Sequence, residues 1–193
     1  SCIQTSRGCP VGCDFCSVTR FSGRKIRRRP IADIVDEWNA MDSREVFVVD
    51  DNFFGVGKRH AQWARELLRA LIRHGKKRYW FSQTSLNIGA DVESMRLAYK
   101  AGCRGMLVGI ESFSDANLKA FSKGLNRKLL SDYQKLVDGF HKAGLAVFGG
   151  FIIGAEDDTE ETVAETALRA VQLGIDIIQI TNLTPLPGTA LYD

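Results

Sequence analysis

Short apolar runs alternate with longer amphipathic segments along the whole chain. Six of the runs are rich in β-branched and aromatic residues and are short enough for strands, at 2–5, 45–50, 79–81, 106–108, 146–148 and 177–180. They are nearly continuous rather than alternating, which is typical of strands buried on both faces of a parallel sheet. We therefore expect six parallel strands.

Segments with helical periodicity separate these strands. Apolar residues recur every three or four positions at 31–41, 64–72, 95–99, 130–140 and 162–173. Pro30 suits a first helical position, and Thr159 suits a helix N-cap. A glycine follows four of the helical segments, and at each we expect the left-handed conformation that ends a helix. These glycines are Gly75, Gly102, Gly144 and Gly174.

Strands that alternate with helices are joined by right-handed parallel crossovers. The sequence therefore predicts an α/β fold, either an open doubly wound sheet or a full or partial barrel. No linker or low-complexity run divides residues 1–193, so we expect a single domain. Because no initiator Met is present and the first residues already resemble a strand, we expect a fragment or an excised domain of a longer protein.

Composition and charge are those of an ordinary globular chain. Hydrophobic residues make up 45% of the sequence and charged residues 25%, and the net charge of +3 does not call for a nucleic-acid partner. No apolar run is long enough to span a bilayer, and no signal peptide is recognisable. Six basic residues crowd one loop, where a solvated loop or a contact to another domain is favoured over binding of phosphates, RNA or a nucleotide tail. They are Arg20, Arg24, Lys25, Arg27, Arg28 and Arg29.

Three cysteines, Cys9, Cys13 and Cys16, follow the first predicted strand with the spacing C-x3-C-x2-C. They lie too close together for a disulfide framework, so we expect free thiols in a reducing cytoplasm. Thiolates are soft ligands that suit zinc or iron–sulfur clusters. A 4Fe–4S cluster held by three cysteines keeps one iron open for another ligand. We expect Cys2 and Cys103 to be buried small residues.

Structural zinc and simple electron transfer are the alternatives to an open cluster. Zinc in structural sites takes four protein ligands, and the chain offers no second pair of ligands close to the cysteines. Its three histidines all lie in predicted helices, at His60, His74 and His141. An electron carrier normally completes its cluster with a fourth cysteine, and none follows at the expected spacing.

Polar or glycine-rich residues follow each of the first five predicted strands. They are the cysteine loop, Asp50-Asp51-Asn52, Ser82-Gln83-Thr84, Glu111-Ser112 and Gly154-Ala155-Glu156-Asp157. Ligands of parallel α/β folds bind at the carboxyl ends of the strands. The sequence therefore predicts one site that gathers these residues.

The C-x3-C-x-Phe-C motif after a first strand resembles the radical S-adenosylmethionine (SAM) superfamily, and the resemblance extends over essentially the whole chain. It implies a partial (β/α)6 barrel, similar to a TIM barrel, with a 4Fe–4S cluster on Cys9, Cys13 and Cys16 at the carboxyl ends of the strands. SAM would chelate the open iron. One electron would cleave it to a 5′-deoxyadenosyl radical, which abstracts hydrogen from an unknown substrate.

Four residues match family motifs that contact the methionine part of SAM or its ribose. Asp51 and Asn52 take the place of the second-strand motif, usually Gly-Gly-Glu, that contacts the methionine amino group. Glu111 matches a fourth-strand residue near the ribose or methionine. Lys123 matches a cation that offsets the methionine carboxylate.

Five further residues match positions near the nucleoside of SAM. Ser82 and Gln83 end the third strand, where polar groups of relatives meet the ribose. Gly150 and Ile152 belong to a fifth-strand G-x-I-x-G motif whose apolar residue packs on adenine. Phe15 matches an aromatic residue that shields the cluster and lies near adenine.

Two features resemble the subgroup with an N-terminal cobalamin-binding domain, namely Asp51-Asn52 and the stretch 185–189 after the sixth strand. This resemblance implies cobalamin-dependent methyl transfer, or a cyclisation or rearrangement, with cobalamin bound outside these residues. A methylthiotransferase acting on RNA or protein is the alternative within the family. A non-catalytic iron–sulfur or zinc protein is the alternative outside it. As partners we expect a small-molecule substrate and an electron donor such as flavodoxin or ferredoxin, without nucleic acid.

Overall fold

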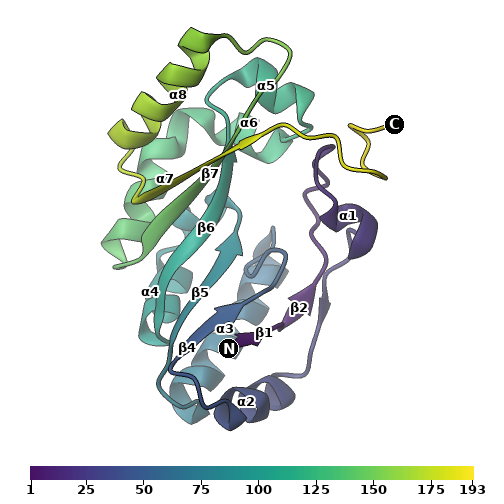
Figure 1. Cartoon of the computed structure of the whole chain (residues 1–193). Helices are drawn as coiled ribbons and strands as arrows, with labels where there is room; N and C mark the ends of the chain where they lie inside the picture. The colour runs from purple at the N-terminus through teal and green to yellow at the C-terminus, as the bar shows by residue number, and fades with distance from the viewer.

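A curved sheet with helices along its convex side forms the framework of the computed structural model, which describes residues 1–193 (Figure 1). Six parallel strands pair in the order β1, β4, β5, β6, β7, β8. Since β1 and β8 are the two edges and do not pair with each other, the barrel is partial. The strands are β1 (Cys2–Ile3), β4 (Glu45–Val48), β5 (Tyr79–Thr84), β6 (Cys103–Glu111), β7 (Ala146–Ile153) and β8 (Ile177–Asn182).

Helices follow the strands as the periodicity predicts. The longer ones are α2 (Ile31–Ala40), α3 (Lys58–His74), α4 (Val92–Lys100), α7 (Tyr133–Lys142) and α8 (Glu160–Gln172). Pro30 directly precedes α2, and Thr159 caps α8 through a reciprocal pair of hydrogen bonds with Thr162. All six predicted strands and all five predicted helices are confirmed. No helix is long and apolar enough to cross a membrane.

Several short elements lie between these. They are α1 (Val18–Phe21), α5 (Asp115–Ala120), α6 (Gly124–Leu129), the 3₁₀ helices η1 (Leu86–Ala90) and η2 (Leu130–Asp132), and an antiparallel ribbon of β2 (Ser6–Arg7) and β3 (Arg27–Arg28). The sequence did not predict the ribbon, because two-residue strands carry no periodicity. The ribbon brackets the cysteine loop and the first three cations of the basic run, while Arg27 and Arg28 of that run form β3.

Three of the four predicted helix-ending glycines adopt the left-handed conformation: Gly102, Gly144 and Gly174 have φ of 99°, 83° and 79°. The prediction for Gly75 is wrong, since its φ is −83°. Glycine is still required there, because a Cβ would lie 2.7 Å from the carbonyl oxygen of Leu71. The chain leaves α3 by passing close to its last turn.

The two faces of the sheet are buried to different extents, and the prediction of burial on both is wrong. In β5, Trp80, Ser82 and Thr84 are buried while the alternate residues are only partly covered or exposed. On the concave side, the rings of Phe81 and Phe47 lie 5.4 Å apart, and Phe47 is 44% exposed. A run that lines an open barrel has the same composition as one covered on both faces, so the sequence could not distinguish them.

The two cysteines outside the motif differ in burial. Cys103 is fully buried, as predicted, and burial raises the pKa of its thiol to about 12. The prediction for Cys2 is wrong: it is exposed, because β1 is an edge strand and Cys2 pairs with the exposed Phe47.

Candidate functional site

The cysteine loop lies between β2 and α1, at the carboxyl ends of the strands (Figure 1). Its backbone is fixed by later segments: Gly8 N donates to Asp51 Oδ2 at 2.6 Å, and Cys9 N donates to the carbonyl of Gly23 at 3.1 Å. Gly8 has a φ of 102°, and a Cβ there would lie 2.5 Å from a backbone oxygen of Lys25. Only glycine fits such an approach.

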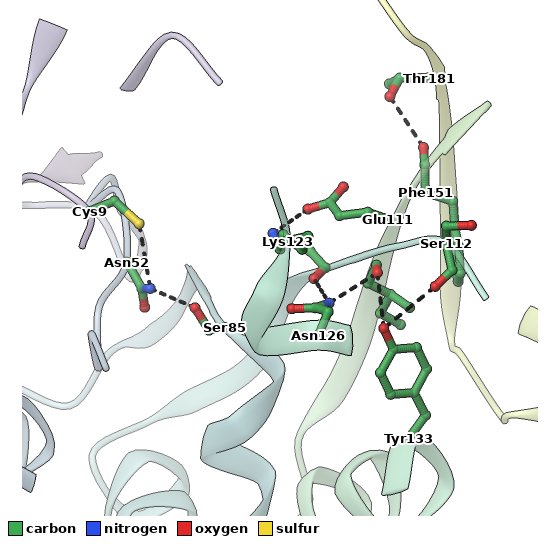
Figure 2. Close-up of polar contacts among 12 residues, drawn as sticks. Cys9, Asn52, Ser85, Glu111, Ser112, Lys123, Asn126, Tyr133, Phe151 and Thr181 are labelled. Carbon is green, nitrogen blue, oxygen red and sulfur yellow. Dashed lines mark hydrogen bonds and ion pairs between the residues drawn. The ribbon is translucent and has the colours of Figure 1, made fainter. Parts of the chain in front are cut away.

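Asp51 and Asn52 position this loop. While Asp51 holds Gly8, the Nδ2 of Asn52 donates to Ser85 Oγ at 2.7 Å and lies 3.8 Å from Cys9 Sγ (Figure 2). The preceding Asp50 is fully buried and accepts hydrogen bonds from Thr5 and Ser6. Burial raises the pKa of Asp50, although these hydrogen bonds oppose the shift. Asp50 thus joins the start of β2 to the loop that follows β4, and Asn52 carries the polar contact to a cysteine.

The three thiols are free and partly buried. Burial raises the pKa of Cys13 to about 11 and also raises the pKa of Cys16. The electrostatic interaction of each thiol with Cys9 raises its pKa further. No three His, Cys, Asp or Glu side chains converge closely enough to hold one metal ion, as a zinc site requires. In an iron–sulfur cluster each cysteine binds a different iron, so three thiols from one loop fit that group in number and chemistry.

Glu111 and Lys123 form a buried ion pair beside the cysteine loop. Lys123 Nζ lies 2.7 Å from Glu111 Oε1, and both side chains are about nine-tenths covered (Figure 2). Glu111 ends β6 at a register shift with a φ of 68°, which is strained for a residue other than glycine. Gly109 makes room for the pair, because a Cβ there would lie 2.3 Å from Glu111 Oε1.

Lys123 remains a cation in this setting. Burial alone would lower its pKa, but the Glu111 carboxylate and the thiols of Cys13 and Cys9 outweigh that effect and raise it. Its ammonium also lies 5.9 Å from the centre of the Phe15 ring. The site thus combines soft thiol ligands with a fixed positive charge a short distance away.

Two helical residues brace the strained end of β6. Asn126 Nδ2 donates to the carbonyls of Gly109 and Ile110 at 2.9 and 3.0 Å, and the Tyr133 hydroxyl lies 3.4 Å from the same Ile110 oxygen (Figure 2). Burial raises the pKa of Tyr133 to about 12, so the hydroxyl stays protonated. Sequence reasoning missed both residues, since nothing in a helical pattern marks an inward polar contact to a distant strand.

A small apolar cluster separates from the main core near the cysteine loop. It consists of Phe121, Ile152 and Ala155, with Phe15 and Leu183 packed against it. The rings of Phe15 and Phe121 meet edge to face at 5.7 Å. Phe15 and Ile152, both expected near adenine, are therefore brought together.

The other residues expected near the nucleoside have different surroundings. A Cβ on Gly150 would meet no atom closer than 3.8 Å, so glycine keeps space on the concave side. Gln83 is partly exposed on that side. Ser82 faces the helices instead, is fully buried, and donates from Oγ to the carbonyl of Val48 at 2.8 Å. The hydroxyl of Ser82 thus forms a hydrogen bond that joins β5 to β4.

Asp158 fixes the turn after β7, which the sequence marked only up to Asp157. Its Oδ2 accepts from Gly154 N and Ala155 N at 2.8 and 3.0 Å, and its Oδ1 accepts from Asn117 at 2.8 Å. These bonds set the path of the chain beside Ile152. No acidic residue could be singled out from sequence here, because Glu156, Asp157 and Asp158 are adjacent.

We expect Asp158→Ala to loosen this turn, since Gly154 N and Ala155 N lose their acceptor. Hydrogen exchange measured by mass spectrometry should become at least tenfold faster in peptides covering 153–158, as removal of hydrogen bonds of about 1 kcal/mol each implies. Asp157→Ala is the matched control, because no hydrogen bond to its carboxylate is formed. Equal exchange in the two variants would contradict the assignment.

The last residues of the chain reach back to the cysteine loop (Figure 1). Leu191 N donates to the carbonyl of Asp14 at 3.1 Å, and the Asp14 carboxylate accepts from Ser122. Asp14 N in turn donates to the carbonyl of Phe121 at 3.3 Å. The mouth of the partial barrel is therefore bridged by loops where the sheet itself is open.

The family model of the radical SAM superfamily matches residues 3–170. Bacteriochlorophyllide d C-12(1)-methyltransferase of Chlorobaculum tepidum is 33% identical over 99% of this chain and 41% of its own length. The hopanoid C-2 methylase of Rhodopseudomonas palustris is 31% identical over 99% of this chain and 37% of its own length. The chain thus spans about two-fifths of the length of these relatives.

Solved structures agree on the fold. The radical S-adenosylmethionine methyltransferase TsrM of Kitasatospora setae, whose structure holds cobalamin and a [4Fe-4S] cluster, superposes with a TM-score of 0.86. The match covers 99% of this chain and 38% of that one, at 23% identity. The six-stranded partial barrel is therefore the same fold.

Proposed function

The chain belongs to the radical S-adenosylmethionine superfamily, and from that membership we propose that it is the core of a cobalamin-dependent methyltransferase. Members of this superfamily bind a 4Fe–4S cluster and SAM. The curated relatives described above are methyltransferases, and the similar TsrM structure contains cobalamin. Methyl transfer is therefore better supported than the ring-forming or methylthiolating alternatives. Cobalamin would be held by residues outside this chain.

The arrangement that carries the proposal is the three-thiol loop beside a buried, charged lysine. Cys9, Cys13 and Cys16 would hold the cluster, which supplies one electron for cleavage of SAM when bound. Lys123 would attract the methionine carboxylate, because a cation in a desolvated site interacts strongly with an anion. Glu111 holds Lys123 in place and could share it with that carboxylate.

The remaining residues would position SAM along the concave side. Asn52, next to Cys9, lies where a polar side chain can reach the methionine amino group, while Asp51 fixes the loop. Gln83 would meet the ribose from β5, with Ser82 holding the strand beneath it. The adenine would pack between Phe15 and Ile152, over the space that Gly150 keeps open. A small molecule is the proposed substrate, and a low-potential protein the proposed electron donor.

Anaerobic reconstitution tests this proposal. We expect about four iron ions per chain and formation of 5′-deoxyadenosine that depends on both SAM and reductant. Iron analysis and chromatography of the products measure the two quantities. A chain that binds zinc stoichiometrically and cleaves no SAM would instead support a non-catalytic metal protein.

A further inference from the structure

A basic surface beside the cysteine loop is not used by the proposed function. A pocket of about 260 Å³ reaches Cys13 and Cys16 there, and Arg20, Arg24 and the turn at Gly188 also line it. None of the residues proposed to contact SAM lines this pocket. Two of the residues that would hold iron therefore line a surface separate from the SAM residues.

The six cations of the basic run differ in whether other groups of the fold already bind them. The side chains of its last three cations all have partners within the chain. Arg27 donates to the Ser22 carbonyl, and Arg28 contacts His60 and the ring of Trp63. Arg29 donates to the Gln4 carbonyl and forms an ion pair with Glu37. Arg20 and Lys25, in contrast, are exposed, and their side chains make no hydrogen bond or ion pair. These two charges are free to meet a partner.

The segment that carries the free cations is fixed against the cysteine loop. Arg24 Nη2 lies 3.3 Å from the carbonyl of Gly12, and the carbonyl of Gly23 accepts from Cys9 N at 3.1 Å. A partner held by this segment is thereby held at a defined position relative to the thiols. Preorganised contacts of this kind reduce the free-energy cost of binding.

Phe21 adds an exposed apolar side chain to the segment that carries these cations. It lies in α1 directly after Arg20 and is 85% exposed. One exposed aromatic side chain needs no explanation alone, but this one directly follows the unpaired Arg20 and precedes the unpaired Lys25 by four positions. An aromatic anchor surrounded by a charged rim is the usual composition of a protein–protein interface.

We propose that Arg20, Phe21 and Lys25 form the docking surface for a small acidic protein that carries one electron. This inference rests on the proposed function, because reductive cleavage of SAM consumes one electron from the cluster. The carrier is oxidised by one electron and the cluster is reduced by one, and no bond or proton is exchanged. Unpaired cations attract an acidic carrier over a distance and orient it.

A nucleic acid fits this surface less well. Sites for single-stranded nucleic acid stack successive bases on several aromatic side chains, whereas this surface has one. The acid that lines the pocket, Asp14, is bound to Ser122 and does not neutralise Arg20. The surface therefore favours an acidic protein.

Anaerobic titration of the reconstituted protein with an acidic plant-type ferredoxin tests the proposal, with calorimetry giving the Kd at low and at moderate salt. We expect binding that weakens as salt rises, because exposed charge pairs are screened. Arg20→Glu/Lys25→Glu should raise the Kd roughly tenfold or more, and Phe21→Ala about tenfold. Both variants avoid Arg24, whose contact with Gly12 supports the cysteine loop, and should keep the cluster absorbance of the parent protein.

Lys76→Glu/Lys77→Glu is the matched control, since it changes the net charge equally on an exposed surface at the amino end of β5. The Kd should be unchanged in this variant. An equal loss in the control, an unchanged Kd in the Arg20/Lys25 variant, or capture of an oligonucleotide in place of ferredoxin would each overturn the proposal. Dithionite reduces the cluster without a docking surface, so failure of dithionite to drive SAM cleavage would refute the proposed function. The ferredoxin affinities would still show whether Arg20, Phe21 and Lys25 form a docking surface.

Discussion

Cys13→Ala is expected to abolish the 4Fe–4S cluster. Cys13 is one of three thiols in the loop, and no fourth cysteine lies near enough to replace it, since Cys2 is on β1 and Cys103 is buried in β6. Two thiolates cannot hold three of the four irons. We therefore expect loss of the brown cluster absorbance and of most of the bound iron, together with loss of SAM cleavage.

Cys2→Ala is the control for this experiment. It also removes one thiol, but an exposed one on an edge strand, so iron content and absorbance should stay at the level of the parent protein. Circular dichroism should show the same helix content in both variants, because Cys13 lies in a loop without regular structure. A full cluster in the Cys13 variant would refute the ligand assignment.

The repeating strands and helices were predictable because each carries its own periodicity. Thr159 shows this for the local features: a threonine before an apolar helical segment predicts a cap, and the cap forms. The cysteine spacing was equally local, so the loop that carries the three thiols could be located from sequence. Gly75 shows where this local reasoning fails. A glycine after a helix can be required for a left-handed φ or for a close approach to another part of the backbone, and only the path of the chain decides which of the two applies.

The polar contacts of the site depend on tertiary structure, and the sequence could not specify them. Asp51 is predicted to contact SAM, and its carboxylate also holds Gly8, which lies more than forty positions earlier in the chain. The turn that Asp158 fixes and the strand end that Asn126 braces likewise join segments far apart in sequence. Residue type predicted which positions were polar at the strand ends. It did not predict which of them support the cysteine loop and which face open space.

The strained end of β6 explains why Glu111 and Lys123 lie where they do. A register shift in the strand and a positive φ turn Glu111 toward Lys123, and Asn126 and Tyr133 hold the carbonyls around that bend. Backbone strain of this kind costs about 1–3 kcal/mol and persists where surrounding contacts stabilise it. A carboxylate placed this way keeps the lysine charged and oriented when no ligand is near. The pair is therefore the part of the site whose contributions to stability and to binding can be separated by mutation.

Lys123→Met is expected to impair both stability and SAM binding. It leaves the Glu111 carboxylate buried without a partner, which should lower the free energy of unfolding by about 3–5 kcal/mol. Loss of a charge-assisted contact with the methionine carboxylate, about 1.5–3 kcal/mol, should weaken SAM binding at least tenfold. Urea unfolding of the apo chain and calorimetric titration of the reconstituted protein with SAM measure the two effects.

The double variant Glu111→Gln/Lys123→Met separates these effects. Because it removes both buried charges, it should regain most of the lost stability, as replacement of a whole buried pair is often close to neutral. SAM affinity should remain low, since the cation is still absent. Asp115→Asn/Arg127→Met is the matched control: this pair is exposed, with Arg127 Nε 2.7 Å from Asp115 Oδ1, and should change stability by less than about 1 kcal/mol and leave SAM binding intact. If the double variant regained SAM affinity together with stability, Lys123 would support the fold without binding the methionine carboxylate.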